Sequence, residues 1–185
     1  MINNFKSRVN SMAKNITIYE DIDEGSSVYF VNNEVKLTFY NLNPDYYPEY
    51  DAYKLDEDGN SISLPQYNNF SMIVMADCNN HKIFFPGDIF TTAQNHYYDL
   101  VGQADIYLVE HHGLNYTTNT NYLNNLRAKI NIITNYGKDH RKKIWQSFIG
   151  EKHPTVKRCA ENGILYDCAH GPVIVDIYKD NLISQ

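Results

Sequence analysis

Two adjacent histidines follow an apolar stretch near the middle of the chain. The stretch is 106–109, and Glu110, His111, His112 and Gly113 come directly after it. The chain has only seven histidines, and placing two side by side at the end of a buried strand adds nothing to packing. Neutral imidazole binds transition metals, and it exchanges protons near neutral pH. The pair is therefore a candidate for a metal site or an acid–base site.

Two further polar motifs lie where an element is expected to begin or end. Gly87 and Asp88 follow the apolar run 83–86, and His153 precedes Pro154, which suits the first turn of a helix. In layered α/β folds, ligands bind where loops leave the ends of strands. A carboxylate and imidazoles that meet there would form the oxygen and nitrogen site that Zn²⁺, Mn²⁺ or Fe²⁺ accepts. Each motif also has a structural explanation, since Gly-Asp commonly closes a turn and a histidine before proline can cap a helix.

The spacing of the two histidines limits what they can do together. Successive residues of a strand point to opposite faces, so His111 and His112 cannot both reach one ion unless the backbone turns there. We expect Gly113 to supply that turn. One histidine is then a ligand, and its neighbour orients the site or contacts the substrate. A metal-free alternative pairs Asp88 with one histidine as acid and base, within hydrogen-bond reach.

The elements that must position these motifs alternate between strands and helices. This order predicts an α/β (α+β) fold with a mixed sheet and helices on one face. Strands are expected within 15–20, 26–31, 34–40, two within 70–88, 104–113, 130–137, and two on either side of Gly171 within 164–178. Helices are expected within 90–103, 119–128, 142–150 and 153–163.

Local signals support several of these elements. The asparagine pairs at 32–33 and 79–80 favour tight hairpin turns between strands. Thr91 or Thr92 is the expected N-cap of the helix within 90–103, and Gly102 is expected to end it. We divide the chain into a polar N-terminal arm, 1–14, and one domain, 15–185, which includes a long acidic loop at 41–69.

Composition limits the possible partners and compartments. The net charge of −6 argues against a broad binding surface for nucleic acid, although the basic stretch 138–143 leaves this point open. No apolar run reaches the roughly 20 residues that span a bilayer, and 1–14 lacks the apolar segment of a signal peptide. We therefore expect a cytoplasmic protein with no membrane segment. The three cysteines lack the spacing of a zinc site or disulfide framework, which favours reduced, buried thiols.

The order of the motifs resembles the C-terminal half of metallo-β-lactamase-fold hydrolases, in particular the ComEC-like branch. Members of that branch show Asn and Ser before a strand, a strand ending in Gly-Asp, an Asp-containing strand ending in His-His-Gly, and His-Pro before the last helix. The matching residues here are Asn69 and Ser71, Gly87 and Asp88, Asp105 with 111–113, and His153 with Pro154. The resemblance covers residues 15–178.

The resemblance implies an αββα sandwich with metal ions at one rim between its two sheets. It implies that Asp88 is a metal-bridging carboxylate, that His111 or His112 is a ligand or active-site histidine, and that His153 lies near the substrate. The implied cofactor is zinc, with manganese or iron as alternatives. The implied reaction is metal-dependent hydrolysis of a phosphodiester or similar anionic ester.

The sequence also departs from that family. The metal-binding motif HxHxDH, or its variant HxDxDH, is absent from the sequence, only about seventy residues precede the matched strand pair, and Leu114 replaces a small serine. We therefore expect half of the sandwich, with little or no hydrolysis by the isolated chain, and the sequence leaves open whether that chain holds the metal. Its expected partner is a complementary N-terminal lobe or a second copy. The alternative is a non-catalytic binding or assembly module derived from this fold.

Overall fold

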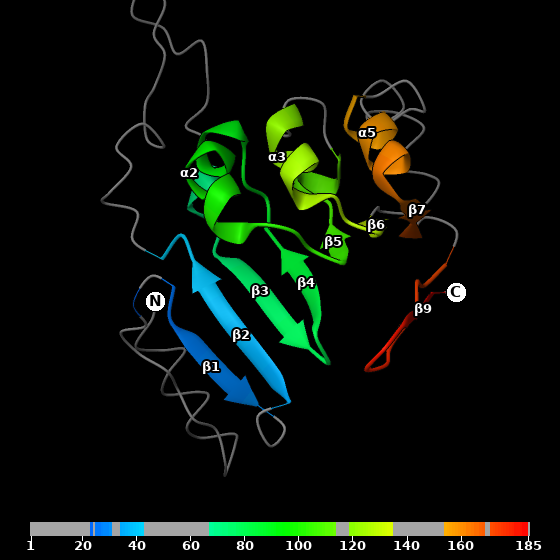
Figure 1. The fold of residues 1–185 in the computed structure, drawn as a ribbon. Helices are drawn as coiled ribbons and strands as arrows, with labels where there is room; N and C mark the ends of the chain where they lie inside the picture. Colours follow the sequence, from blue (N-terminus) through cyan, green and yellow to red (C-terminus); the bar gives the residue numbers. More distant parts are fainter. Residues whose placement is uncertain are drawn as a thin grey trace, which may run out of the picture.

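The computed structural model describes residues 23, 25–30, 34–42, 67–113, 119–134, 154–168 and 171–184. These residues form a mixed seven-stranded sheet, a layer of helices and a separate two-stranded sheet (Figure 1). Within these ranges, no helix is long and apolar enough to cross a membrane. The mixed sheet and its layer of helices confirm the expected α+β class.

The sheet has an antiparallel part and a parallel part. The strands are β1 Ser27–Phe30, β2 Val35–Tyr40, β3 Ile73–Cys78, β4 His81–Phe85, β5 Ile106–Leu108, β6 Ile130–Ile133, β7 Ile164–Asp167, β8 Val175–Ile177 and β9 Leu182–Ser184. The helices are η3 Tyr67–Phe70, α2 Thr91–Val101, η4 Glu110–Gly113, α3 Thr120–Leu126 and α5 Pro154–Asn162. The large sheet has the order β1 to β7, antiparallel from β1 to β4 and parallel from β4 to β7. Parallel neighbours place their carboxyl ends at the same edge.

Both expected hairpins are present. Strand β1 pairs with β2, and β3 pairs with β4. Asn79 and Asn80 join β3 to β4 with φ angles of 52° and 64°. Asparagine tolerates this left-handed conformation better than most residues, and two such residues make the turn that matches strand twist. The asparagine pair at 32–33 lies outside the described residues.

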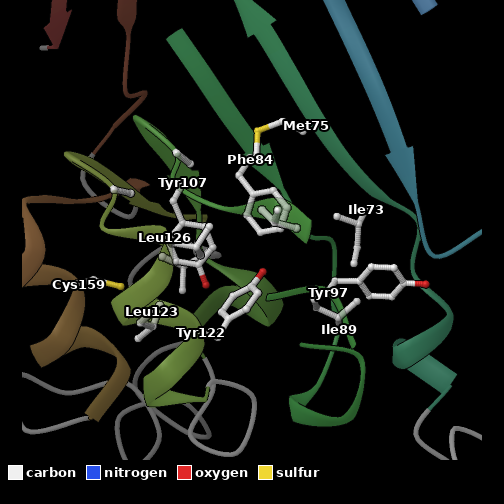
Figure 2. Packing of buried hydrophobic residues seen from close by; sticks show 14 of the residues in the cluster. Ile73, Met75, Phe84, Ile89, Tyr97, Tyr107, Tyr122, Leu123, Leu126 and Cys159 are labelled. Carbon is white, nitrogen blue, oxygen red and sulfur yellow. The ribbon is translucent and has the colours of Figure 1, made fainter. Parts of the chain in front are cut away.

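The helices α2, α3 and α5 lie along one face of the sheet (Figure 1), as expected. Alternate strand residues point to this face, where Phe84 and Tyr107 from the strands pack with Tyr97, Tyr122 and the rest of the main core (Figure 2). A smaller core fills the opposite face: Ile106, Ile130 and Ile132 pack with residues of β8 and β9, including Val175, Ile177 and Leu182. The central parallel strands β5 and β6 are therefore covered on both faces.

Two expectations need correction. The N-cap of α2 is Phe90, whose side chain makes no cap hydrogen bond, rather than Thr91 or Thr92. Asn69 supplies the cap from a distant segment, because its Oδ1 accepts hydrogen bonds from the backbone N–H groups of Phe90 (2.9 Å) and Ala93 (3.3 Å). Gly102 ends the helix with φ 64°, as expected.

The C-terminal strands also differ from the expectation. Strands lie on either side of Gly171, but β7 extends the large sheet whereas β8 pairs with β9, which was not anticipated. The cysteines are free, and of the three only Cys159 is fully buried. Several predictions fall outside the described residues: the arm 1–14, the strand within 15–20, most of the loop 41–69 and the helix within 142–150.

Candidate functional site

The carboxyl ends of β4, β5 and β6 lie side by side and bring two of the sequence motifs together. Asp88 follows β4, η4 with its two histidines follows β5, and Thr134 follows β6. The backbone N–H of His111 donates to the carbonyl of Gly87 at 3.3 Å, which joins the two motifs directly. His153 lies outside the described residues, so its position relative to this edge is not assigned.

The Gly87–Asp88 turn is held by the segment that precedes β3. The backbone N–H of Asp88 donates to Ser71 Oγ at 3.3 Å. Asn41 Nδ2 in turn donates to the carbonyls of Asn69 (2.5 Å) and Ser71 (2.8 Å). Gly87 has φ +65°, and a Cβ there would lie 2.9 Å from Ser71 Cβ. The Asn and Ser of the sequence motif are thus supports of the Asp88 turn.

The backbone of the two histidines makes its own turn. His111 has φ 46° and ψ 38°, and His112 has φ 57° and ψ 24°. The expectation that Gly113 supplies the turn is therefore wrong. Consecutive left-handed residues other than glycine are uncommon and strained, and such strain clusters at functional sites.

His112 has a defined orientation. Its Nδ1 lies 2.5 Å from the carbonyl oxygen of Thr134 and 3.1 Å from Thr134 Oγ1. A carbonyl oxygen only accepts hydrogen bonds, so Nδ1 carries the proton and donates. In the neutral ring, Nε2 then has the lone pair. A carbonyl that fixes one imidazole nitrogen in this way is typical of metal-binding histidines.

No protein-family model matches this chain, and no curated protein does. The interpretation of the edge therefore depends on its residues and their geometry.

The ring of His111 packs against Phe90, which precedes α2. Its ring centroid is 4.9 Å from that of Phe90, and its Nδ1 is buried without a hydrogen-bond partner within the described ranges. Burial lowers the pKa of His111; the negative charge of Asp88 opposes this shift, and His112 adds to it. The net lowering of the pKa favours the neutral ring at pH 7, with Asp88 close enough to influence it.

The chemical types of the donor groups at this edge suit a divalent metal ion. They are one carboxylate and two imidazoles, whose ring centroids are 6.5 Å apart at an interplanar angle of 72°. In the part of the chain that the structure describes, no three His, Cys, Asp or Glu side chains converge as a metal-binding group.

Sequence reasoning missed the buried residues behind the histidines. Glu110 is fully buried, and its Oε1 accepts a hydrogen bond from Gln94 Nε2 at 3.1 Å. Burial raises the pKa of both Tyr122 and Cys159, and the charge of Glu110 raises it further. Thr134 was missed too, because its contact with His112 crosses from β6 to η4. The only local sequence signal of this buried group was Glu110 itself, a glutamate directly before the histidines.

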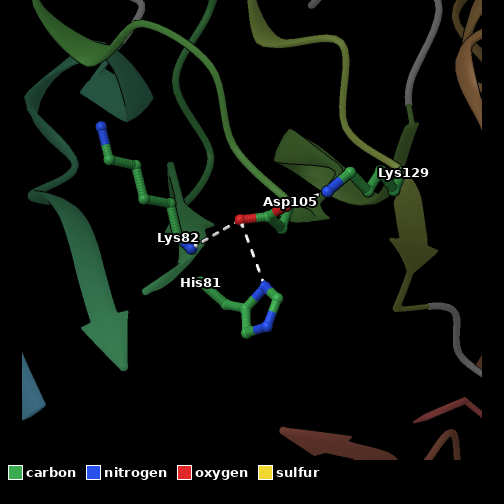
Figure 3. A network of polar contacts seen from close by, with 4 residues as sticks. All are labelled: His81, Lys82, Asp105 and Lys129. Carbon is green, nitrogen blue, oxygen red and sulfur yellow. Dashed lines mark hydrogen bonds and ion pairs between the residues drawn. The ribbon is translucent and has the colours of Figure 1, made fainter. Parts of the chain in front are cut away.

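Asp105 belongs to the motif series but lies at the opposite, amino end of β5 (Figure 3). Its Oδ2 accepts a hydrogen bond from the backbone N–H of Lys82 at 3.0 Å, and its Oδ1 accepts one from Lys129 Nζ at 2.7 Å. His81 Nδ1 lies 3.6 Å from Oδ2. Asp105 therefore ties the beginnings of three parallel strands together, far along the strand from the histidines.

Proposed function

We propose that this chain carries part of the site of a metal-dependent hydrolase of the metallo-β-lactamase type, which acts on a phosphodiester or similar anionic ester. The observation that carries the proposal is that Asp88, His111 and His112 follow neighbouring parallel strands at one sheet edge, joined by the backbone contact of His111 with Gly87, with His112 Nδ1 fixed by Thr134. The resemblance of the motif order supports it as well.

The residues at the edge have separable roles in this proposal. His112 through Nε2 and Asp88 through its carboxylate would hold the ion, either zinc, manganese or iron. A bound ion of this kind activates water and stabilises developing negative charge. His111, next to Asp88, would orient the site or contact the substrate. His153 would lie near the substrate, as the resemblance implies.

The site is proposed to be incomplete within this chain, because the sequence contains neither HxHxDH nor HxDxDH. The remaining ligands would come from a complementary N-terminal lobe. The isolated chain is then expected to hydrolyse little or no phosphodiester.

The second face of the sheet supports a sandwich. One row of directly paired residues runs across all seven strands on this face: Val28, Leu37, Ala76, Ile83, Ile106, Ile130 and Ile164. Every residue in the row is apolar, as expected for a face that meets another sheet. The β8–β9 hairpin already packs on part of it. We include the αββα arrangement in the proposal on this ground.

The test is zinc retention by the full chain. Protein is incubated with Zn²⁺, freed of excess ion and measured by elemental mass spectrometry, as wild type, Asp88→Ala and His112→Ala. His96→Ala is the matched control, since it removes an exposed imidazole from α2. We expect both site variants to retain less zinc than wild type and His96→Ala. Equal zinc in wild type and Asp88→Ala would contradict the proposed ligand role.

A hydrolysis assay tests the second part. Wild type, with Zn²⁺ or Mn²⁺, is incubated with bis(p-nitrophenyl) phosphate. Robust turnover that Asp88→Ala abolishes would show that the chain is sufficient by itself, against the proposal of an incomplete site.

The apolar row also favours a second candidate, a non-catalytic assembly module. Val28, Leu37 and Ala76 lie on the same face as the row's β4 to β7 members, beyond the residues of the second core. Ala76 is already buried, whereas Val28 and Leu37 are partly exposed, so a second copy or another lobe packing there would bury apolar area of these two residues. Sedimentation equilibrium tests this idea. A monomer at high dilution that binds no hydrophobic dye would count against it.

A further inference from the structure

One buried side chain contacts the chain on both sides of the histidine turn. Gln94, fully buried in the first turn of α2, donates from Nε2 to Glu110 Oε1 at 3.1 Å. Its own Oε1 accepts from the backbone N–H of Asn119 at 2.7 Å. Glu110 directly precedes the histidines, and Asn119 is the N-cap of α3. A single amide therefore fixes the two points between which the histidines lie.

The same helix turn is tied to the Asp88 side of the edge. Asn69 Oδ1 binds the backbone N–H groups of Phe90 and Ala93, and the backbone N–H of Gln94 donates to the Phe90 carbonyl at 3.1 Å. Phe90 is two residues beyond Asp88. Any shift of Gln94 relative to Glu110 would therefore move the histidines relative to the carboxylate.

The histidine turn needs such external support. Two consecutive left-handed residues with side chains persist only where the surroundings determine the backbone. His111 N–H to Gly87 and His112 to Thr134 are two of these contacts. The third is the hydrogen bond from Gln94 to Glu110. Glu110 is buried, and a buried carboxylate needs hydrogen-bond donors because leaving it unsatisfied is costly.

We propose that Gln94 is a positioning residue: through Glu110 and Asn119 it sets the placement of His111 and His112 at the edge that Asp88 completes. The inference rests on the proposed function in treating His112 as a metal ligand and His111 as a second residue of the same site. The imidazole placement itself can be measured without any metal.

Three variants separate position from stability. Gln94→Leu removes both hydrogen bonds. The double variant Gln94→Glu with Glu110→Gln exchanges the two groups, so that the carboxylate at 94 accepts from both Asn119 N–H and the new amide at 110. Asn95→Ala is the matched control, because Asn95 Oδ1 accepts from the Asn119 side chain at 2.7 Å on the solvent side of the same helix.

The first readout is the ¹H–¹⁵N NMR spectrum of the imidazole groups in metal-free protein, at one fixed pH, with amide exchange of His111 and His112. The folded Gln94→Leu protein is expected to show shifted imidazole signals and faster exchange at both amides. The double variant and Asn95→Ala are expected to retain the wild-type pattern. Unchanged histidine signals in folded Gln94→Leu protein would overturn the inference. If Gln94→Leu does not fold, the double variant decides, because displaced histidine signals in that folded protein would overturn it.

The second readout is zinc affinity. Loss of a residue that orients metal ligands typically weakens binding by about 10- to 100-fold, so we expect a loss of about tenfold or more in Gln94→Leu. The double variant should stay within about threefold of wild type on the same scale. Failure of wild type itself to bind zinc would reject the ligand roles proposed for Asp88 and His112 in this chain, whereas the positioning role would still be decided by the NMR signals.

Discussion

The two ends of the parallel strands carry similar side chains in different states. At the amino ends, Asp105 accepts hydrogen bonds from Lys82 and Lys129 and lies near His81. At the carboxyl ends, Asp88 uses its backbone N–H in the turn, and its carboxylate has no hydrogen bond among the described residues. A carboxylate whose charge is already matched is a structural tie, whereas one beside neutral imidazole is available to a cation.

Consecutive left-handed residues occur at both ends, as the hairpin asparagines Asn79 and Asn80 before β4 and as His111 and His112 after β5. The left-handed histidines are at the carboxyl end, and the strain there is held by contacts from β4, β6 and α2. At the amino end, Asp105 also accepts the N–H groups of Lys129 and Ile130 at its backbone carbonyl, each at 3.0 Å. Aspartate and histidine occur at both ends of the parallel strands, so residue type alone does not identify a site. What distinguishes the functional candidate is a carboxylate without a hydrogen bond among the described residues, next to two imidazoles, whereas the Asp105 carboxylate at the amino end is hydrogen-bonded on both oxygens.

The largest expected effect is on the support of the Asp88 turn. Gly87→Ala places a Cβ 2.9 Å from Ser71 Cβ on a residue with φ +65°. The left-handed conformation costs about 1–2 kcal/mol with a side chain, and overpacking adds about 1–3 kcal/mol. We expect the free energy of unfolding, measured by urea denaturation, to fall by about 3 kcal/mol from these two costs.

Ser71→Gly in the same protein tests the cause. It removes the Cβ that the new methyl group meets, so the double variant should be more stable than the sum of the two single changes predicts. Strict additivity would show that the steric contact is not responsible.

The next effect concerns the amino end. Asp105→Ala leaves the Lys82 N–H without its acceptor and removes the partner of Lys129, so unfolding free energy should fall by about 2 kcal/mol. Asp176→Ala, at an exposed position of β8, is the control and should change stability little. Zinc retention should be unaffected by either change. A loss of zinc in folded Asp105→Ala protein would remove the distinction between the two ends.

Much of the framework could be predicted from the sequence. Short apolar runs and paired asparagines indicated the two hairpins, Gly102 indicated the end of α2, and Pro154 indicated the start of α5. These signals are local, so they are visible in a short stretch of sequence. The Gly87–Asp88 and His111–His112 motifs were likewise placed correctly at strand ends, and parallel pairing brought them to one edge.

The missed features depend on distant segments or on locally unfavourable conformations. Asn69 caps a helix that begins more than twenty residues later along the chain, so Thr91 and Thr92 were the natural local choice. The left-handed histidines oppose intrinsic preference, which pointed to Gly113 instead. Gln94 could not be recognised because an interior helix glutamine carries no local sign of burial.

A smaller effect is expected from pH, and it sharpens the role of Asp105. Burial raises the pKa of its carboxyl group, but hydrogen bonds from Lys129 and Lys82 and the charges of Lys129 and His81 lower it below the ordinary value of 3.8. A lowered folded pKa means that the unfolded chain binds more protons, so this stabilisation is present above 3.8 and is lost as pH falls through the folded pKa.

The measurement compares wild type with Asp105→Asn across this acidic range. Their difference in unfolding free energy should stay constant above the unfolded pKa and shrink below it. A difference that grows on acidification would reverse the assigned direction of the shift.

The smallest expected effect on stability is at Asp88. Its backbone N–H supports the turn and is retained in Asp88→Asn, while no described hydrogen bond depends on the carboxylate. Unfolding free energy should therefore change by about 0.5 kcal/mol or less, as for a side chain outside the structural network. Asp105→Asn is the matched change at the other end and should cost more, because it weakens a charge-assisted contact with Lys129. Equal costs at the two positions would mean that both carboxylates are structural, and the carboxyl-end edge would lose its main claim to be a binding site.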